Sequence, residues 1–164
     1  GPIGGDVNYV KYLLEGTRYF SMPRDTVLAA RGVVGYLHGF GSKDAPVYER
    51  FYLGGINSIR GFKTRGISPK DPTTNELIGG ASEALLNIEY IFPIFPEQRF
   101  KGVVFFDTGN TWDGGFLNGL RYSAGLGIRW LSPLGPLRLE WGYNLDRKDG
   151  EDSSQWDFTV GTSF

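Results

Sequence analysis

One stretch of the chain carries residue types well suited to chemistry. The sequence "GGINSIRGFKTRG", residues 54–66, places Arg60 and Arg65 among four glycines. A segment so rich in glycine is too irregular for a strand or a helix and indicates a loop. A guanidinium is permanently charged, and burying it without carboxylate partners costs several kcal/mol. If this loop is ordered, Arg60 therefore requires acidic neighbours.

Other residues that could carry chemistry do not combine into a site. The 164 residues include no cysteine, which excludes disulfides, thiolate metal sites and cysteine nucleophiles. His38 is the single histidine, so a histidine-based metal site is not expected, and no hydrolase triad can be assembled around Ser42 and Asp44. Glu89 and Asp107 could serve as an acid–base pair or as counter-ions of an arginine. The sequence thus indicates no metal and no cofactor.

Composition narrows the class of protein. The formal net charge is -1 and there is no Lys/Arg-rich run, which argues against a nucleic-acid partner. No window approaches eighteen consecutive apolar residues, so no transmembrane helix is predicted. A search for long apolar windows does not detect a transmembrane β-barrel, because its lipid-facing residues occupy only alternate positions.

The end of the chain alternates with a period of two residues. In "QWDFTVGTSF", residues 155–164, polar residues and glycine alternate with Trp156, Phe158, Val160 and Phe164. Residues 120–130 and 136–145 repeat this pattern. A two-residue period predicts β-strands.

Further strands are predicted upstream, at residues 9–20, 26–37, 81–92 and 100–112, which gives about seven strands and no helix. The alternation is blurred where Leu85, Ile91 and the run 103–106 place apolar residues on both faces. Between the strands lies a segment of about forty residues, 38–80, that contains Arg60. Connections of this length are usually functional or disordered.

An alternating antiparallel sheet fits either a soluble sandwich or a membrane barrel. The polar faces carry glycine, Asn, Ser and scattered Arg and Glu, as a crowded lumen would, and Tyr122 and Trp130 lie at opposite ends of one strand, as in interfacial girdles. A sheet in lipid must close to pair its edges. Because barrels of this kind usually have an even number of strands, and the chain starts at Gly1, we expect it to be part of a larger barrel.

Three segments resemble the BamA family of outer-membrane protein insertases. The segment "ERFYLGGINSIRGF" is similar to the lead-in and (V/I)RGF/Y motif of that family's sixth extracellular loop. The segment "VVFFDTGNTW" resembles its motif of an aspartate followed by glycine and an aromatic, and residues 155–164 resemble its last strand. The resemblance extends over residues 1–164. It implies an all-β fold, the last seven strands of a sixteen-stranded antiparallel transmembrane β-barrel, without the POTRA modules.

The resemblance also implies that segment 38–80 folds inward and that its arginine meets acidic residues on the inner wall. On this basis the loop-anchoring motif is Ile59, Arg60, Gly61 and Phe62, and its wall partners are Glu89 and Asp107. The final strand, 155–164, is similar to a terminal recognition signal formed by Trp156, Phe158, Val160 and Phe164.

The function implied by the resemblance is assistance in folding nascent β-barrel proteins into the bacterial outer membrane, without covalent chemistry. The implied partners are outer-membrane lipid, nascent outer-membrane proteins and the lipoproteins of the assembly complex. Two alternatives remain open at this point: a sister polypeptide transporter of the TamA or two-partner-secretion type, and a passive porin.

Overall fold

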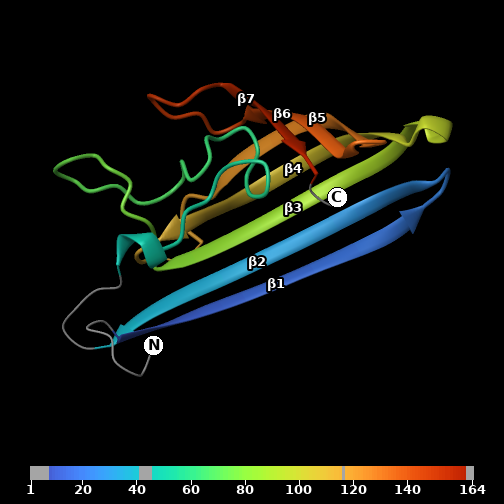
Figure 1. The fold of residues 1–164 in the computed structure, drawn as a ribbon. Helices are drawn as coiled ribbons and strands as arrows, with labels where there is room; N and C mark the ends of the chain where they lie inside the picture. Colours follow the sequence, from blue (N-terminus) through green and yellow to red (C-terminus); the bar gives the residue numbers. More distant parts are fainter. Residues whose placement is uncertain (1–7, 41–45, 116, 162–164) are drawn as a thin grey trace.

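The structure is a computed structural model that describes residues 8–40, 46–115 and 117–161. Within these residues seven strands form one antiparallel sheet in chain order (Figure 1). Their bounds are β1 Asn8–Met22, β2 Thr26–Phe40, β3 Ser82–Phe95, β4 Phe100–Trp112, β5 Arg121–Ser132, β6 Gly135–Asn144 and β7 Ser154–Val160, with short 3-10 helices η1 at Val47–Glu49 and η2 at Pro96–Gln98. The predicted all-β antiparallel fold is confirmed. Among the described residues no helix is long and apolar enough to cross a membrane.

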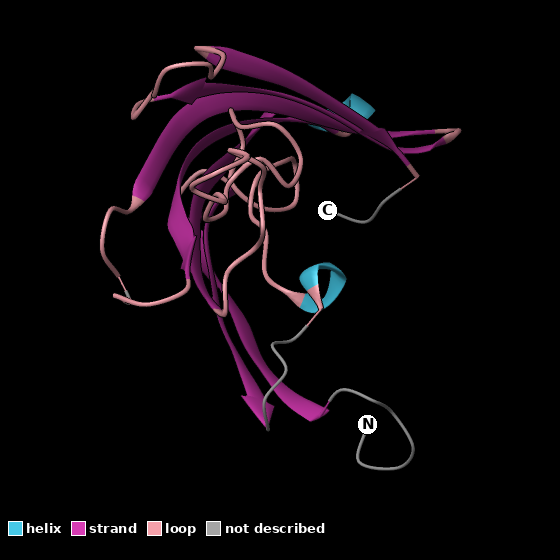
Figure 2. Ribbon diagram, turned by 90° about the vertical axis from the view of Figure 1, so that its left-hand side faces the viewer, coloured by secondary structure: helices cyan, strands magenta, loops and turns pink. Residues whose placement is uncertain are grey.

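The sheet is a curved wall that does not close on itself, and the long loop between β2 and β3 lies on its concave side (Figure 2). Cross-strand register brings Asp107 opposite Ser123 and Gly125 opposite Gly142 on this concave face. The opposite, convex face exposes large apolar side chains, among them Leu86, Ile88, Val104, Leu126, Ile128, Trp156 and Phe158. An outward apolar face is what a wall in contact with lipid requires.

The ends of the loop and of the last strand differ from the sequence prediction. Strand β2 continues to Phe40, so His38 lies at the end of a strand, while β3 begins at Ser82. The predicted loop, 38–80, is therefore shorter at its start. Strand β7 ends at Val160, and the rest of the predicted strand includes Phe164, which lies outside the described residues.

An apolar core lies between the loop and the concave face. It joins Val33 and Leu85 of the sheet to loop residues Leu53, Ile59, Phe62 and Ile67. Each large apolar side chain buried in this way contributes about 1.5–3 kcal/mol. The core explains why Leu85 interrupts the polar pattern of its strand, since the loop covers it.

The face assignment makes a first prediction. Leu126 lies in the middle of β5 on the convex face and is 57% exposed. We expect Leu126→Arg in the complete protein to weaken folding into lipid vesicles by about 2–4 kcal/mol, because a charge near the bilayer midplane loses its hydration. Urea titration of vesicle-inserted protein measures this cost. A cost for Leu126→Arg no larger than that for Leu126→Ala would contradict a lipid-facing position.

Candidate functional site

Arg60 is the largest fully buried side chain among the described residues, with 1% of its surface exposed. Its Nε and Nη2 donate to Oδ2 and Oδ1 of Asp107 at 2.8 and 2.7 Å, in a bidentate pair. Its Nη1 donates to Glu89 Oε1 at 2.6 Å and to Glu140 Oε2 at 3.1 Å. Its backbone N–H also donates to Asp107, at 3.0 Å. The loop thus presents an arginine whose guanidinium nitrogens all donate to acids of the wall.

Phe105 forms the floor beneath this arginine. The Arg60 guanidinium carbon lies 3.7 Å from the centre of the Phe105 ring, within the range of a cation–π contact. The ring itself lies over Gly125 of the neighbouring strand, where a Cβ would come within 2.5 Å of it. Glycine at this position therefore leaves room for the ring, and the ring supports the guanidinium. This stacking accounts for one of the apolar residues in the run 103–106, where the alternation of β4 is blurred.

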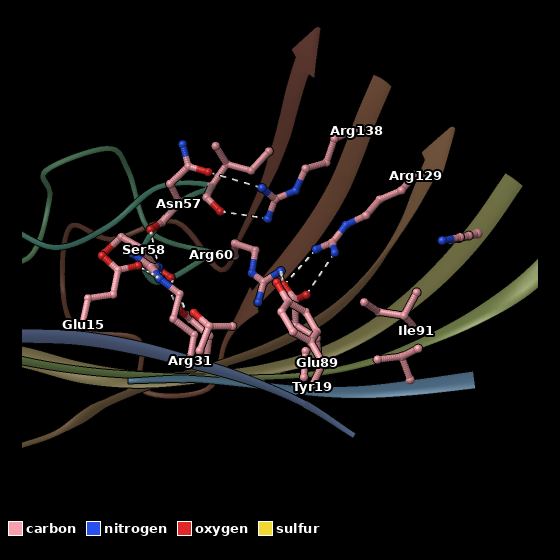
Figure 3. A pocket seen from close by; sticks show the side chains of 16 residues that line it. Glu15, Tyr19, Arg31, Asn57, Ser58, Arg60, Glu89, Ile91, Arg129 and Arg138 are labelled. Atoms are coloured by element: carbon pink, nitrogen blue, oxygen red, sulfur yellow. Dashed lines mark hydrogen bonds and ion pairs between the residues drawn. The ribbon is translucent and has the colours of Figure 1, made fainter. Parts of the chain in front are cut away.

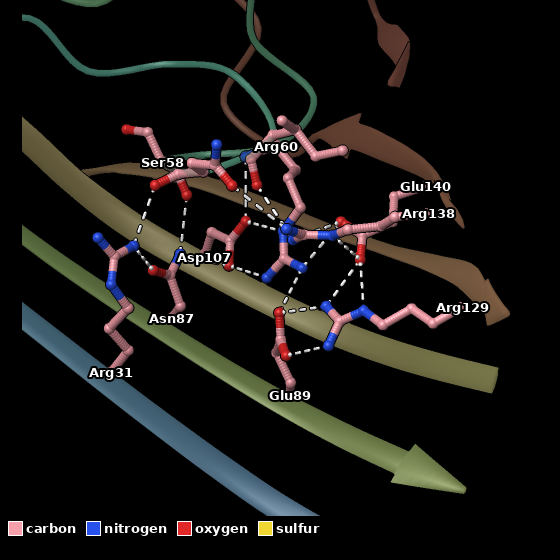
Figure 4. A network of polar contacts seen from close by, with 11 residues as sticks. Arg31, Ser58, Arg60, Asn87, Glu89, Asp107, Arg129, Arg138 and Glu140 are labelled. Atoms are coloured by element: carbon pink, nitrogen blue, oxygen red, sulfur yellow. Dashed lines mark hydrogen bonds and ion pairs between the residues drawn. The ribbon is translucent and has the colours of Figure 1, made fainter. Parts of the chain in front are cut away.

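The carboxylates around Arg60 are shared with further arginines (Figure 4). Arg129 donates to Glu89 at 2.8 and 3.0 Å and to Glu140 at 2.7 and 3.2 Å. Arg138 donates to Glu140 at 3.0 and 3.1 Å. Glu140 is fully buried, so its charge is balanced by these guanidinium groups rather than by water. The site is a network of alternating charges that spans β3 to β6.

The charges of the wall act on the protonation of the loop arginine. Burial lowers the pKa of the Arg60 guanidinium, but the hydrogen bond and charge of Asp107, together with the charges of Glu140 and Glu89, more than offset this effect. The pKa of Arg60 consequently lies above its usual range. Arg60 remains a cation throughout the pH range in which proteins are stable.

A second set of contacts holds the segment just before Arg60, at the edge of a cavity of about 510 Å³ (Figure 3). Arg31 of β2 donates to the carbonyl of Asn57 at 3.0 Å, and Arg138 of β6 donates to Asn57 Oδ1 at 3.2 Å. Asn87 donates to the carbonyl of Ser58 and to Asp107, both at 2.8 Å. The loop is therefore held from strands on opposite sides of the concavity.

Backbone contact between the loop and β6 depends on a pair of glycines. Gly61 has a φ of +88°, a conformation that favours glycine. Its partner is Gly142, where a Cβ would meet the Gly61 nitrogen at 2.3 Å. The loop backbone thus lies directly on the backbone of β6.

The structure brings Arg60 together with Glu89 and Asp107, the wall partners that the family resemblance implied. Ile59, which is fully buried, and Phe62 lie in the apolar core beside Arg60. Trp156, Phe158 and Val160 lie apart from this site, exposed on the convex face of β7. Their role as a recognition signal stays a prediction.

Sequence reasoning did not select Glu140, Arg129, Arg138, Asn87 or Gly142 as members of the site. Each occupies the predicted polar face of its strand, which was the available signal.

Among the described residues no group of three or more His, Cys, Asp or Glu side chains is arranged to hold a metal ion.

Comparison with known proteins identifies the family. Residues 1–164 match the Omp85 superfamily domain. The chain belongs to the Omp85 superfamily. The outer membrane protein assembly factor BamA of Nitratidesulfovibrio vulgaris is 41% identical over 170 residues, which cover 100% of this chain and 22% of that protein. BamA of Neisseria meningitidis serogroup B is 30% identical over 195 residues, covering 98% of this chain and 24% of that protein.

A solved structure shares the fold of this Omp85 chain. The crystal structure of BamA from Haemophilus ducreyi lacking POTRA domains 1-3 matches with a TM-score of 0.86 and 26% identity, covering 99% of this chain and 36% of that one. The chain spans about a quarter of the length of the curated relatives it matches. The predicted family and bacterial outer-membrane localisation are confirmed, and the open sheet agrees with a part of a larger barrel.

The charge network predicts how Arg60 variants behave. Arg60→Ala leaves buried carboxylates without their shared cation, a change that typically costs about 3–5 kcal/mol. We expect faster proteinase K cleavage within residues 54–80 of the complete folded protein. Arg60→Lys should restore protection only partly, because an ammonium lacks the planar fork.

The matched control is Arg65→Ala, which removes an exposed arginine from the same loop. It should leave the cleavage rate close to that of the wild type. Equal cleavage of wild type and Arg60→Ala would mean that Arg60 does not hold the loop.

The glycine contact gives a separate prediction. Gly142→Ala places a methyl group against the loop backbone, so it should lower the melting temperature of the complete protein and raise protease cleavage at residues 54–66. Gly32→Ala is the control, since a Cβ at Gly32 has no atom within 4 Å among the described residues. Equal effects of the two substitutions would argue against backbone contact at Gly142.

Proposed function

We propose that the protein containing this chain assists the folding and insertion of nascent β-barrel proteins into the bacterial outer membrane. The observation that carries this proposal is the 41% identity, over the whole chain, to an outer membrane protein assembly factor. A second assembly factor is 30% identical over nearly the whole chain. These relatives support the insertase function over the transporter and porin alternatives.

The proposed role of this chain is to form part of the barrel wall and to hold its inserted loop. The convex face would contact outer-membrane lipid, and nascent outer-membrane proteins would be the substrates. Lipoproteins of an assembly complex are proposed as further partners on the basis of the family resemblance. No nucleic acid is expected to bind, because the chain carries a formal net charge of -1.

The site itself favours a mechanical role over covalent chemistry. Glu89 and Asp107 each accept hydrogen bonds from the Arg60 guanidinium, so they serve as its counter-ions. All four carboxylate oxygens of this pair accept hydrogen bonds from the guanidinium groups of Arg60 or Arg129, as expected of a structural contact between loop and wall. We propose that these residues fix the position of the loop and catalyse no bond-making step.

The test is reconstitution of the complete protein in liposomes with a urea-unfolded β-barrel substrate. We expect the substrate to fold several-fold faster than in protein-free liposomes, measured by its protease-resistant fraction over time. Arg60→Ala should reduce this acceleration, whereas the exposed-residue control Arg65→Ala should retain it.

Two outcomes would contradict the insertase function. One is the absence of any acceleration by wild-type protein that is itself folded in the bilayer. The other is release of the polypeptide across the membrane without insertion, which would favour the transporter alternative.

A further inference from the structure

Another buried arginine, Arg121, joins the loop motif to the last hairpin. Arg121 begins β5 and is 5% exposed. Its guanidinium carbon lies 4.9 Å from the centre of the Phe62 ring, which is itself buried in the loop core. The same guanidinium reaches the connection between β6 and β7. It is therefore shared by two segments that are far apart in sequence.

The β6–β7 connection, residues 145–153, is organised around this guanidinium. Arg121 Nε donates to Asp146 Oδ2 at 2.8 Å, and Nη2 donates to the Asp146 carbonyl at 2.8 Å. Nη2 also donates to both carboxylate oxygens of Glu151, at 2.6 and 2.9 Å. Arg121 thus bonds residues near both ends of the connection.

Glu151 also makes hydrogen bonds with other residues at the start of the connection and within it. Its Oε2 accepts hydrogen bonds from Asn144 Nδ2 at 2.9 Å and from the Lys148 amide at 3.2 Å. Partial burial raises the pKa of Glu151. The hydrogen bonds from Arg121, the Lys148 amide and Asn144 lower it by a larger amount, so the net shift of the pKa is downward. The carboxylate is thereby kept ionised as the centre of the turn.

The Phe62 ring affects the strength of these contacts because it helps to exclude water from the Arg121 guanidinium. With the ring in place, Arg121 is largely shielded from water, and its bonds to Asp146 and Glu151 are stronger than in an aqueous setting. With the ring withdrawn, water reaches the guanidinium and competes for the same carboxylates. The loop motif also touches β6 at Gly142, and β7 is hydrogen-bonded to β6.

We propose that Arg121 is a positioning residue that couples the docked state of the loop motif to the order of the β6–β7 connection, and through it to the last strand. Docking of Phe62 favours an ordered connection, and an ordered connection favours docking of Phe62. Such a coupling is reciprocal by thermodynamic necessity. It concerns the protein in the absence of substrate and does not depend on the proposed insertase function.

The test is hydrogen exchange, read by mass spectrometry, on the complete protein in lipid nanodiscs without substrate. The reporters are the amides of Asp146, Lys148 and Glu151, which donate hydrogen bonds within the connection or to Asn144. Phe62→Leu keeps an apolar side chain but removes the aromatic face. We expect it to speed exchange of these reporters about 2- to 5-fold, as loss of a cation–π contact of about 0.5–1 kcal/mol implies.

The reciprocal and double variants separate coupling from local damage. Arg121→Gln should speed exchange in residues 54–66 as well as in the connection. Adding Phe62→Leu to Arg121→Gln should give little further change at the reporters, because the shared contact is already lost. If Arg121→Gln does not fold, Arg121→Lys takes its place, and the strands β3 and β4 report folding in every sample.

Ile67→Val is the matched control, since Ile67 lies in the same apolar core of the loop. It should leave the reporters at their wild-type rate. The proposal is overturned if Phe62→Leu speeds exchange in the loop and leaves the reporters unchanged. It is equally overturned if the effects of Phe62→Leu and Arg121→Gln at the reporters are additive.

Discussion

The structure depends on a charge that has been removed from water. Arg60 is 1% exposed, and an isolated guanidinium at that depth would destabilise the docked loop by several kcal/mol. Asp107, Glu89 and Glu140 remove this penalty only when β3, β4 and β6 stand in their observed register. The ion pairs therefore require this arrangement of the strands, in addition to contributing stability. A slipped strand would turn its carboxylate to the convex face.

The loop has two further kinds of contact that reinforce this condition. Its apolar residues cover Val33 and Leu85, which would otherwise lie exposed on a polar face. Its backbone approaches β6 so closely at Gly61 and Gly142 that no side chain fits between them. Charge, apolar burial and backbone contact all place the loop at the same position. The described part of this loop, residues 46–81, can be ordered because the entropy lost on docking is offset by these contacts together.

The two faces of the sheet follow different physical rules. The convex face carries apolar side chains that suit lipid. Lipid requires these side chains to be apolar but does not require particular residues at particular positions. The concave face holds buried arginines and acids whose partners are individually defined. Arg129 and Arg138 show this, since each donates to a carboxylate that Arg60 also uses. Membership of the Omp85 superfamily is consistent with such a wall.

The sequence by itself determined the strands, their faces and the need for acids near Arg60. These follow from local rules: the two-residue period is a property of the extended backbone, and a buried guanidinium always requires counter-ions. The resemblance to the BamA family singled out Glu89 and Asp107, which lie on or beside predicted polar faces that follow the loop. Only the tertiary structure decided that Glu140 also contacts Arg60, that Phe105 lies beneath it, and that Phe62 meets Arg121. Those contacts join residues up to 80 positions apart, and they depend on the register and curvature of the whole sheet, which no local period encodes.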